Sequence, residues 1–411
     1  MTWPSLCCRN ETSGDSYDKP MTESVPGVMT RATVIRRRHR PELHTCIIQR
    51  GGLLELHLTL LPQPGESAAI MLERLAALLK PHNASVVRHE VFGSLAVEPD
   101  FANALERSFG EQPWPVTFVE GASCDGESVV GMHVLAVAGT RVESLSFAGR
   151  VIGRIFNDGH ARHCVLGDIR PTDHSAPCEQ QAMEVFENIE AALSHAGMSM
   201  SNVARTWLFL DDILAWYGPL NQVRRDFFER RHLFDRTVPA STGVGAKNPA
   251  GAALVAGAWA VEPANGSLFV GEVCSPMQCP APAYGSCFSR AVEIVTPGWR
   301  RMFVSGTASI APSGANVCAG DVDGQIDLTM QVVRAILVSR ELDYADVTRA
   351  TAYLRNLADA PLFRRWCRKL GLENWPLVTT QAVVCRDELL FEIELDAMVT
   401  ISQSATWTWK I

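Results

Sequence analysis

One order of secondary structure recurs three times along the chain, and this repetition limits the possible folds more than any other feature. The last third shows it most clearly, because its apolar residues switch between the two-residue period of strands and the longer period of helices. The predicted order is two strands, a helix, a strand, a helix and a closing hairpin, at residues 288–295, 301–310, 324–340, 346–354, 360–370, 377–384 and 389–399.

The middle third repeats this β-β-α-β-α-β-β order. Residues 162–167 align with residues 301–306, and residues 202–210 align with residues 346–354. The first third repeats the order more faintly, with a leucine stripe along residues 72–79 that predicts a helix. The period of roughly 120 to 145 residues is too long for a solenoid and indicates three small units of one type.

Each unit is a small α+β layer whose sheet has one apolar face, and that face must be covered. Three such sheets packed edge to edge would form a pseudo-trimeric barrel with the helices outside. We expect the three degenerate repeats at residues 45–140, 141–270 and 271–400. A disordered extension is expected at residues 1–44 and a tail at residues 401–411.

Composition and charge exclude several classes of protein. Of the 411 residues, 47% are hydrophobic and 20% are charged, which allows a large core and excludes global disorder. The net charge of −8 argues against nucleic acid as the main partner. No apolar run approaches the roughly 18 residues of a membrane span. The twelve cysteines contain no CxxC pair, which indicates reduced thiols in a cytoplasmic protein and neither a disulfide nor a zinc framework.

The predicted last strand carries three carboxylates on one face. Its apolar residues alternate with Glu392, Glu394 and Asp396. Such a face is either in contact with solvent or turned into a cleft between repeats, where burial would raise the pKa of a carboxyl group. All eleven histidines lie at or before His232, so an acid or base in the last repeat must be another residue type. Glu392 is the best candidate because of its mid-strand position.

Five segments in order resemble a known family. They are residues 239–245, 283–291, 304–310, 353–355 and 385–392. The repeated unit, with its Val-Ser-Gly strand end and closing Phe-Glu-Ile-Glu, is similar to the reactive-intermediate deaminase (YjgF-like or RidA-like) family, whose members form trimers with sites at subunit interfaces. Three fused units resemble more closely the chorismatases, which act on chorismate.

The resemblance implies a reaction that needs neither a metal nor another cofactor. Chorismate carries an enolpyruvyl ether, and protonation of its methylene carbon gives an oxocarbenium ion that water or an internal hydroxyl can capture, with loss of pyruvate. Glu392 would supply this proton as a general acid. Cys385 resembles a cysteine that stands near the substrate ring in the benzoate-forming subtype. The expected products are therefore 3-hydroxybenzoate and pyruvate.

Chorismate is a dianion, so its site needs cations. Arg290 and Arg355 lie in the matching segments, and a planar guanidinium holds a carboxylate better than an ammonium group does. Small residues at a strand end allow the backbone to approach a ligand. The substrate-binding residues that we expect are Tyr284, Arg290, Arg355, Cys385, Ser305, Gly306 and Thr307.

One complete site per chain is expected, between the third repeat and a neighbouring repeat. Opposite Glu392, the second repeat has Ala256 or Gly257, and the first has Met132 or His133, none of which is a carboxylic acid. Three fused repeats can satisfy what a trimer of single repeats satisfies, so we expect a monomer.

Three other functions stay open from the sequence. The first is hydrolysis of chorismate to a dihydroxycyclohexadiene carboxylate and pyruvate. The second is an enamine or imine deaminase, which would need an arginine where Leu377 stands. The third is a module that binds a small molecule without converting it. The products formed, a coupled imine assay and binding without turnover would distinguish these functions.

Overall fold

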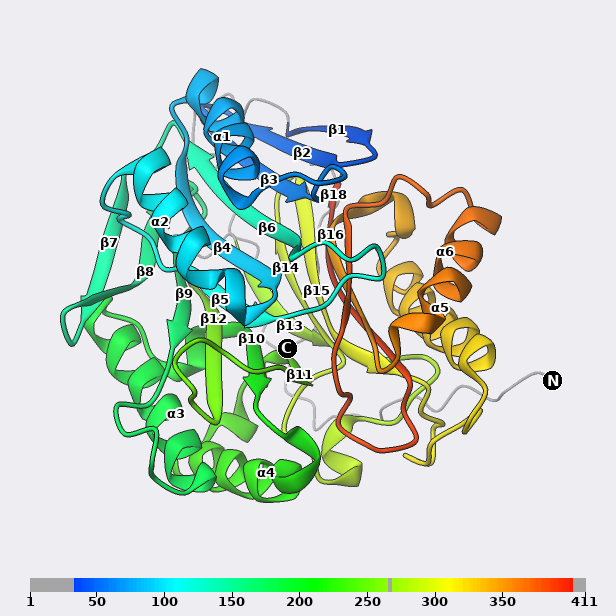
Figure 1. Cartoon of the computed structure of the whole chain (residues 1–411). Coiled ribbons are helices and arrows are strands. Elements are labelled where there is room, and N and C mark those ends of the chain that lie inside the picture. The colour runs from blue at the N-terminus through cyan, green and yellow to red at the C-terminus, as the bar shows by residue number, and fades with distance from the viewer. Residues whose placement is uncertain (1–32, 265–267, 402–411) are drawn as a thin grey trace.

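The computed structural model describes residues 33–264 and 268–401, which form three six-stranded sheets, one in each repeat (Figure 1). The first repeat comprises β1 (Val34–Arg40), β2 (Leu43–Arg50), β3 (Leu53–Leu60), α1 (Ala68–Leu79), β4 (Ser85–Gly93), α2 (Glu98–Phe109), β5 (Thr117–Glu120) and β6 (Val129–Ala138). The second comprises β7 (Val142–Phe147), β8 (Arg150–Asn157), β9 (Ala161–Ile169), α3 (Cys178–His195), β10 (Val203–Leu210), α4 (Ile213–Arg230), β11 (Ala240–Gly245) and β12 (Leu254–Pro263).

The third repeat comprises β13 (Phe269–Val273), β14 (Ala291–Thr296), β15 (Trp299–Ala308), α5 (Val322–Val338), β16 (Val347–Leu354), α6 (Ala360–Lys369), β17 (Leu377–Gln381) and β18 (Phe391–Thr400). Short 3₁₀ helices lie between these elements: η1 (Lys80–His82), η2 (Leu95–Val97), η3 (Met200–Asn202), η4 (Leu233–Asp235), η5 (Ala281–Tyr284), η6 (Tyr344–Asp346) and η7 (Leu357–Asp359).

The three sheets share one strand order, which confirms the predicted internal repetition. The orders are β1-β2-β3-β6-β4-β5, β7-β8-β9-β12-β10-β11 and β13-β14-β15-β18-β16-β17. In the third sheet, β18 runs antiparallel between β15 and β16, and β17 lies parallel to β16 at the edge. The predicted hairpin on either side of residues 297–298 is present as β14 and β15.

Two details of the predicted unit are wrong. Each repeat begins with one additional edge strand, which is β1, β7 or β13. Strand β1 lies inside the extension predicted to be disordered, where its basic residues pair with β2; residues 1–32 and the tail from residue 402 lie outside the described residues. The predicted closing hairpin is also absent, because β16 separates β17 from β18 in the sheet.

Helices cover the outer face of each sheet, and the inner faces meet around a common axis (Figure 1). Each helical layer has its own apolar core, and a fourth core at the centre contains Phe92, Trp207, Trp259 and Phe303 from the three repeats. The parallel edge strand of each repeat packs on the next repeat: β5 on β9, β11 on β15, and β17 on β6. Among the described residues, the three sheets stay separate in their hydrogen-bonded ladders and do not close into one barrel.

Strand β18 shows how the alternating sequence positions its carboxylates. Its apolar residues belong to the core beneath α5 and α6. Its other face turns toward the axis, and the exposed fractions of Glu392, Glu394 and Asp396 are only 5%, 0% and 3%. The acidic face is therefore buried between repeats and is not in contact with bulk solvent.

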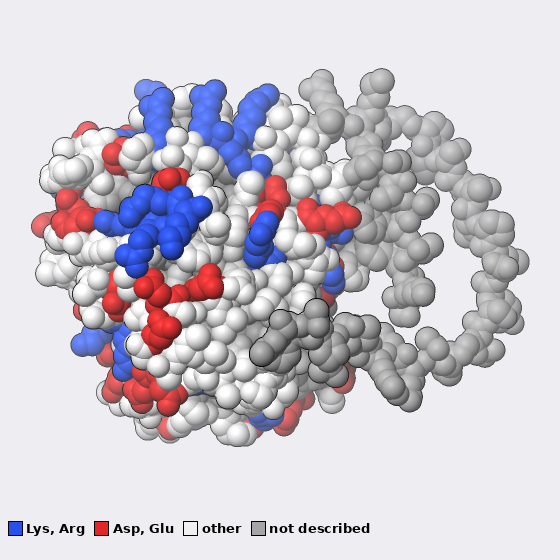
Figure 2. Space-filling view, turned by 90° about the vertical axis from the view of Figure 1, so that its right-hand side faces the viewer, with Lys and Arg blue, Asp and Glu red and all other residues white. Residues whose placement is uncertain are grey.

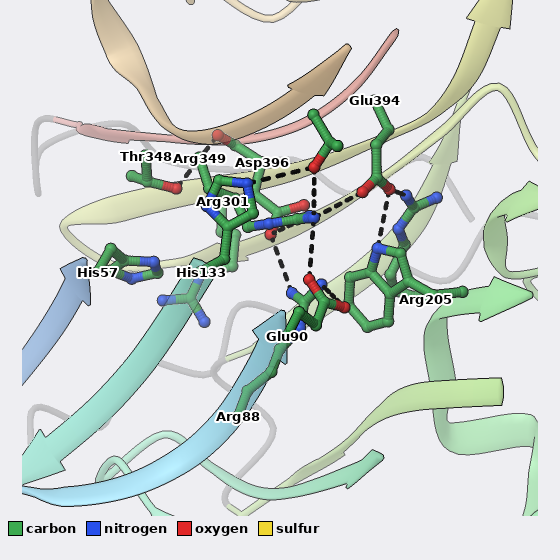
Figure 3. A network of polar contacts seen from close by, with 12 residues as sticks. His57, Arg88, Glu90, His133, Arg205, Arg301, Thr348, Arg349, Glu394 and Asp396 are labelled. Atoms are coloured by element: carbon green, nitrogen blue, oxygen red, sulfur yellow. Dashed lines mark hydrogen bonds and ion pairs between the residues drawn. The ribbon is translucent and has the colours of Figure 1, made fainter. Parts of the chain in front are cut away.

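A charged network fills the axis beside this face (Figure 3). Each of the equivalent strands β4, β10 and β16 has a register shift just before a buried arginine. The guanidinium carbons of these three arginines lie 3.4, 4.9 and 5.6 Å from the ring centroid of Trp207, in the order Arg88, Arg205 and Arg349. Carboxylates supply the opposite charge through Glu90, Glu394 and Asp396.

The part of the chain that the structure describes contains no membrane-spanning helix, no disulfide bond and no group of side chains that could hold a metal ion. Within residues 33–264 and 268–401, every helix is too short or too polar to span a lipid bilayer. The described cysteines are all free thiols. No three His, Cys, Asp or Glu side chains in these residues are grouped closely enough to hold a metal ion.

We predict that Phe303→Ala destabilises the whole chain, because Phe303 is fully buried in the central core and its ring centroid lies 5.3 Å from that of Trp259 in the second repeat. The expected loss in the free energy of unfolding is about 3–5 kcal/mol. Urea unfolding followed by circular dichroism measures it. The control is Val338→Ala at a position that is 54% exposed, with an expected change within about 0.5 kcal/mol. Equal losses in the two variants would contradict the assignment of a shared core.

Candidate active site

A cavity lies between the second and third repeats. Strands β10 and β11 and helix α4 form its wall on the side of the second repeat. Helix η5, strands β15 and β18, and the loop before β18 form the other wall. Its polar lining includes Tyr217, Arg224 and Ser241 from the second repeat, and Tyr284, Arg290 and Glu392 from the third.

A β-bulge in β15 joins the two repeats at this cavity. The register with β18 shifts before Thr307, so that Ser305 and Gly306 stand opposite a single residue. Ser305 Oγ accepts a hydrogen bond from the backbone N–H of Ser241 at 2.9 Å. The backbone N–H of Gly306 donates to Thr242 Oγ1 at 3.0 Å. The bulge therefore fixes β11 of the second repeat against β15 of the third.

Glu392 lies in the wall of the cavity without a hydrogen-bond partner for its carboxyl group among the described residues. Burial, and after it the negative charge of Glu394, raises the pKa of Glu392 to about 8, although Arg205 and Arg290 oppose the shift. The carboxyl group lies directly against Gly306, where any added Cβ would overlap it. Any other residue at this position would displace the Glu392 carboxyl group.

Helix α4 aims one of its faces at the cavity. Tyr217, Leu220 and Arg224 all line it, and their spacing of three and four residues places them on one side of a helix. The helix is kinked at Trp216, which has non-helical backbone angles, and Pro219 follows within the first turns. Proline cannot donate the backbone hydrogen bond of a regular helix, so the local sequence accounts for the kink.

The cavity wall carries three arginines. Arg290 donates two hydrogen bonds, of 3.0 and 2.9 Å, to the carbonyl oxygen of Cys279. The guanidinium carbons of Arg290 and Arg386 each lie 5.3 Å from the ring centroid of Tyr284. Arg224 donates to Ser241 Oγ at 3.3 Å, and its buried Nε has no partner among the described residues. Since Glu392 is protonated near neutral pH, the surroundings of the cavity favour an anionic ligand.

Cys385 lies in the same cavity, beside Glu392 and Tyr217. Burial, and after it the Glu392 carboxylate, raises the pKa of the Cys385 thiol to about 12, although a hydrogen bond with Tyr217 opposes the shift. Burial also raises the pKa of Tyr217 above its usual value. Both side chains are therefore neutral near neutral pH, and the thiol is not poised as a nucleophile.

The structure brings five of the predicted site residues to this cavity. They are Tyr284, Arg290, Gly306, Cys385 and Glu392. Two further predicted residues, Ser305 and Thr307, lie in the same strand, but their side chains do not line the cavity. Thr307 Oγ1 donates to the backbone carbonyl oxygen of Ser305 at 2.8 Å, and Ser305 Oγ donates to the backbone carbonyl oxygen of Ser289 at 2.5 Å, so both side chains bond to backbone at the bulge.

Arg355 is not brought to the cavity. It follows the last residue of β16, and its guanidinium donates to the backbone carbonyl and the carboxylate of Asp387, at 2.7 and 3.2 Å. The side chain of Asp387 is 80% exposed, so this is a surface ion pair. The prediction failed because Arg355 lies beyond the end of β16, where the alternation of a strand no longer fixes the direction of a side chain.

Sequence reasoning missed five polar residues of the cavity, which are Tyr217, Arg224, Ser241, Ser286 and Arg386. The signal for Arg386 was its place beside Cys385. Arg224 had none, because an arginine in an amphipathic helix is usually in contact with solvent, and its 3% exposure follows only from the packing of α4 on the third repeat.

The two other clefts between repeats lack an equivalent acid. Strand register places Gly131 and Val255 at the positions that match Glu392, one residue from the positions predicted. In the cleft between the third and first repeats, side chains of Leu61 and Val378 pack close against Gly131. Among the described residues, the cavity between the second and third repeats is therefore the one cleft with a carboxylic acid at this position.

Comparison with known proteins shows what this arrangement is similar to. Residues 170–262 match the family model of endoribonuclease L-PSP. A crystal structure of a chorismatase superposes with a TM-score of 0.60 at 19% identity, over 76% of this chain and 93% of that chain. The 3-hydroxybenzoate synthase of Streptomyces hygroscopicus is 26% identical over 275 residues, which are 58% of this chain and 74% of that protein. The chain shares the fold of this chorismatase and is similar in sequence to the 3-hydroxybenzoate synthase.

Two of the sequence matches cover only a part of the chain. The endoribonuclease L-PSP model covers the second repeat from the end of β9 to β12. A shorter stretch of 72 residues is 31% identical to Protein DfrA of Myxococcus xanthus, over 18% of this chain and 53% of that protein. The second repeat thus keeps the pattern of the single-repeat family, whereas the third repeat carries Glu392.

We predict that Glu392 makes stability depend on pH between about 4.5 and 8. In this range the folded chain keeps the proton of Glu392, since burial raises its pKa to about 8, whereas the unfolded chain, with a pKa near 4.5, loses it. The free energy of unfolding therefore falls as the pH rises, by up to about 1.4 kcal/mol for each unit of difference in pKa.

Glu392→Gln removes this titration, so its stability relative to the wild type should rise from about pH 5 to about pH 8. Urea unfolding of both proteins at several pH values measures the difference. A difference that stays constant over this range would contradict a protonated, buried Glu392.

Proposed function

We propose that this chain converts chorismate to 3-hydroxybenzoate and pyruvate, with Glu392 as the general acid. The observation that carries the proposal is a buried carboxyl group with a raised pKa in a cavity lined by arginines. The similarity to a 3-hydroxybenzoate synthase supports the reaction class.

The chemistry of chorismate fits a protonated carboxylic acid. Transfer of the Glu392 proton to the methylene carbon of the enolpyruvyl group turns the ether carbon into an oxocarbenium ion. Capture of this ion by a hydroxyl group and loss of pyruvate follow, and Glu392 regains a proton. General acid catalysis of this type contributes on the order of 10²–10⁴-fold to a rate. Because Glu392 has no hydrogen-bond partner among the described residues, its proton is available to a substrate.

The charges around the cavity suit a dianion. Arg224 approaches from the second repeat, and Arg290 and Arg386 from the third, so two carboxylates can be held from opposite walls. We propose Arg290 and Arg224 as substrate-binding residues, with Tyr284 held between two guanidiniums as part of the wall. Ser305, Gly306 and Thr307 contribute through the bulge, which shapes the wall beside Glu392.

The product follows from what captures the oxocarbenium ion. The benzoate route consumes no water overall, whereas hydrolysis to the dihydroxycyclohexadiene carboxylate consumes one molecule of water. Apolar side chains of Leu208, Leu220 and Ile310 line the cavity together with the neutral Cys385 thiol. A wall of this type disfavours an attacking water and supports the route to 3-hydroxybenzoate.

We predict that the purified chain releases pyruvate from chorismate and that Glu392→Gln abolishes this release, because glutamine has no proton to transfer at this step. A coupled enzyme assay measures pyruvate, and chromatography identifies the aromatic product. Release of pyruvate by both proteins would support the reaction but show that another residue is the acid. The dihydroxycyclohexadiene carboxylate as sole product would retain the class and overturn the benzoate route.

Absence of pyruvate from either protein would overturn the proposal. A coupled assay with imine intermediates would then test deamination, and calorimetry with chorismate would test binding without turnover.

We further predict that Arg290→Met raises the KM for chorismate by about 10- to 100-fold, since a hydrogen bond to a charged group contributes about 1.5–3 kcal/mol. Arg355→Met is the matched control, because Arg355 is an arginine of the same repeat that forms a surface ion pair with Asp387. Its KM should change less than about twofold. Initial rates over a range of chorismate concentrations give both values, and equal effects would contradict the assignment.

A further inference from the structure

Glu394 receives more hydrogen bonds than its neighbours on β18. Its Oε2 accepts from Trp207 Nε1 and from Thr242 Oγ1, each at 2.8 Å, and from Arg205. Its Oε1 accepts from Arg349 at 2.6 Å and from the hydroxyl group of Tyr353 at 3.4 Å. These donors come from both the second and the third repeat. The fully buried carboxylate therefore joins the two repeats that form the cavity (Figure 3).

Glu394 and Glu392 lie on the same face of β18, two residues apart, so their side chains are neighbours. A second connection runs through the bulge. Thr242 Oγ1 donates to Glu394 and accepts the backbone N–H of Gly306, and Gly306 lies directly against the Glu392 carboxyl group. A change at Glu394 therefore reaches Glu392 both through space and through this chain of contacts.

The positive charge of Arg205 acts on both Glu394 and Glu392. Its Nη2 bonds to Glu394 and Thr242, but its Nε and Nη1 are buried without a partner among the described residues. Its positive charge also favours the ionised form of Glu392. If Glu394 were neutral, Glu392 would be a remaining carboxylate for this arginine and would give up its proton to pair with it.

We infer that Glu394 is the positioning residue of this site: it holds Arg205 as an ion pair behind the cavity wall and so leaves Glu392 as an unpaired, protonated acid. This inference rests on the proposed function for its catalytic meaning, but the geometry stands without it. Glu394 acts through Glu392 and Arg205 and does not line the cavity.

The third repeat alone combines the two acids. Strand register matches Glu394 with His133 in the first repeat and Gly257 in the second. Gly131 and Val255 stand at the positions of Glu392. Glu394, which pairs with Arg205, is thus present in the same repeat as Glu392.

Other charged or titratable groups face the pair from every neighbouring element. Those around Glu392 come from β10, α4, η5, the residue before β14, β16 and the loop before β18, and they are Arg205, Tyr217, Arg224, Tyr284, Arg290, Tyr353, Cys385 and Arg386. Those around Glu394 come from β4, β6, β10 and β16, and they are Arg88, Glu90, His133, Arg205, Arg349 and Tyr353. None of these groups except Arg205 bonds to Glu394 and also favours ionisation of Glu392.

The test is Glu394→Gln, which removes the charge and keeps the shape. Carbon-detected NMR of glutamate carboxyl groups follows the titration of Glu392, with Glu392→Gln used to assign the signal. We expect the titration midpoint of Glu392 to fall by one pH unit or more. The alkaline limb of the pH–rate profile for pyruvate release should move down by the same amount, with a loss in kcat near pH 8 of about tenfold or more and a smaller change in KM.

Asp396→Asn is the matched control. Asp396 lies on the same strand and bonds to Arg88 and Arg349 of the same network, but it does not contact Arg205. Its replacement should lower stability without moving the Glu392 titration. A merely structural role for Glu394 would therefore give the same result in both variants.

If Glu394→Gln does not fold, Arg205→Met and the double variant keep the inference testable, because the double variant leaves no unpaired Arg205. Removal of Glu394 in the Arg205→Met background should then lower the Glu392 midpoint by much less than one pH unit, because Arg205 is no longer there to be released. A midpoint that falls in the double variant by a full pH unit relative to Arg205→Met, or that does not move in Glu394→Gln, would overturn the role of Arg205.

The two proposals fail in distinguishable ways. The NMR titration needs no substrate, so it judges the role of Glu394 even if the wild type releases no pyruvate from chorismate. Conversely, the wild type could release pyruvate while the Glu392 titration stays the same in Glu394→Gln. This result would retain the proposed function and overturn this inference.

Discussion

The structure depends on the neutralisation of buried charge at the place where the three repeats meet. Each repeat contributes one arginine to the ring of Trp207, and all three are buried: Arg88, Arg205 and Arg349. An unpaired charge in the interior costs several kcal/mol, so these arginines require carboxylates nearby. The first repeat supplies Glu90, and β18 supplies Glu394 and Asp396. The second repeat adds no carboxylate to this group, so its Arg205 depends on Glu394 of β18 for a partner.

The same arrangement explains how one strand carries acids of opposite character. Glu394 is ionised because Arg349, Arg205 and Arg88, one from each repeat, surround it and hold its pKa well below its usual range despite burial. Glu392, two residues earlier, lies beside glycine and apolar side chains, and burial keeps it protonated. Two carboxyl groups with pKa values driven apart by their surroundings are the usual basis for assigning an acid in an active site.

Much of this organisation could be predicted from local sequence patterns. The repeat order, the β14–β15 hairpin and the single acidic face of β18 all follow from apolar alternation. Pairings between distant segments could not be predicted, so β18 was expected beside β17. Strand β1 was missed because arginines replace its alternating apolar residues. Arg224 and Arg355 show the same limit for the site: the first is buried only because α4 packs on another repeat, and the second turns away after its strand ends.

Strand β18 is the last strand in the described part of the chain, and it inserts into the middle of its sheet. During translation, the arginines of the first two repeats leave the ribosome long before the β18 carboxylates that pair with them. Until β18 is made, the third sheet has no strand between β15 and β16, and the nascent chain has neither of the acids discussed above. Closure of the central core and arrival of the acid are therefore one late event, so a chain still in synthesis has the arginines of the cavity wall but not its acid.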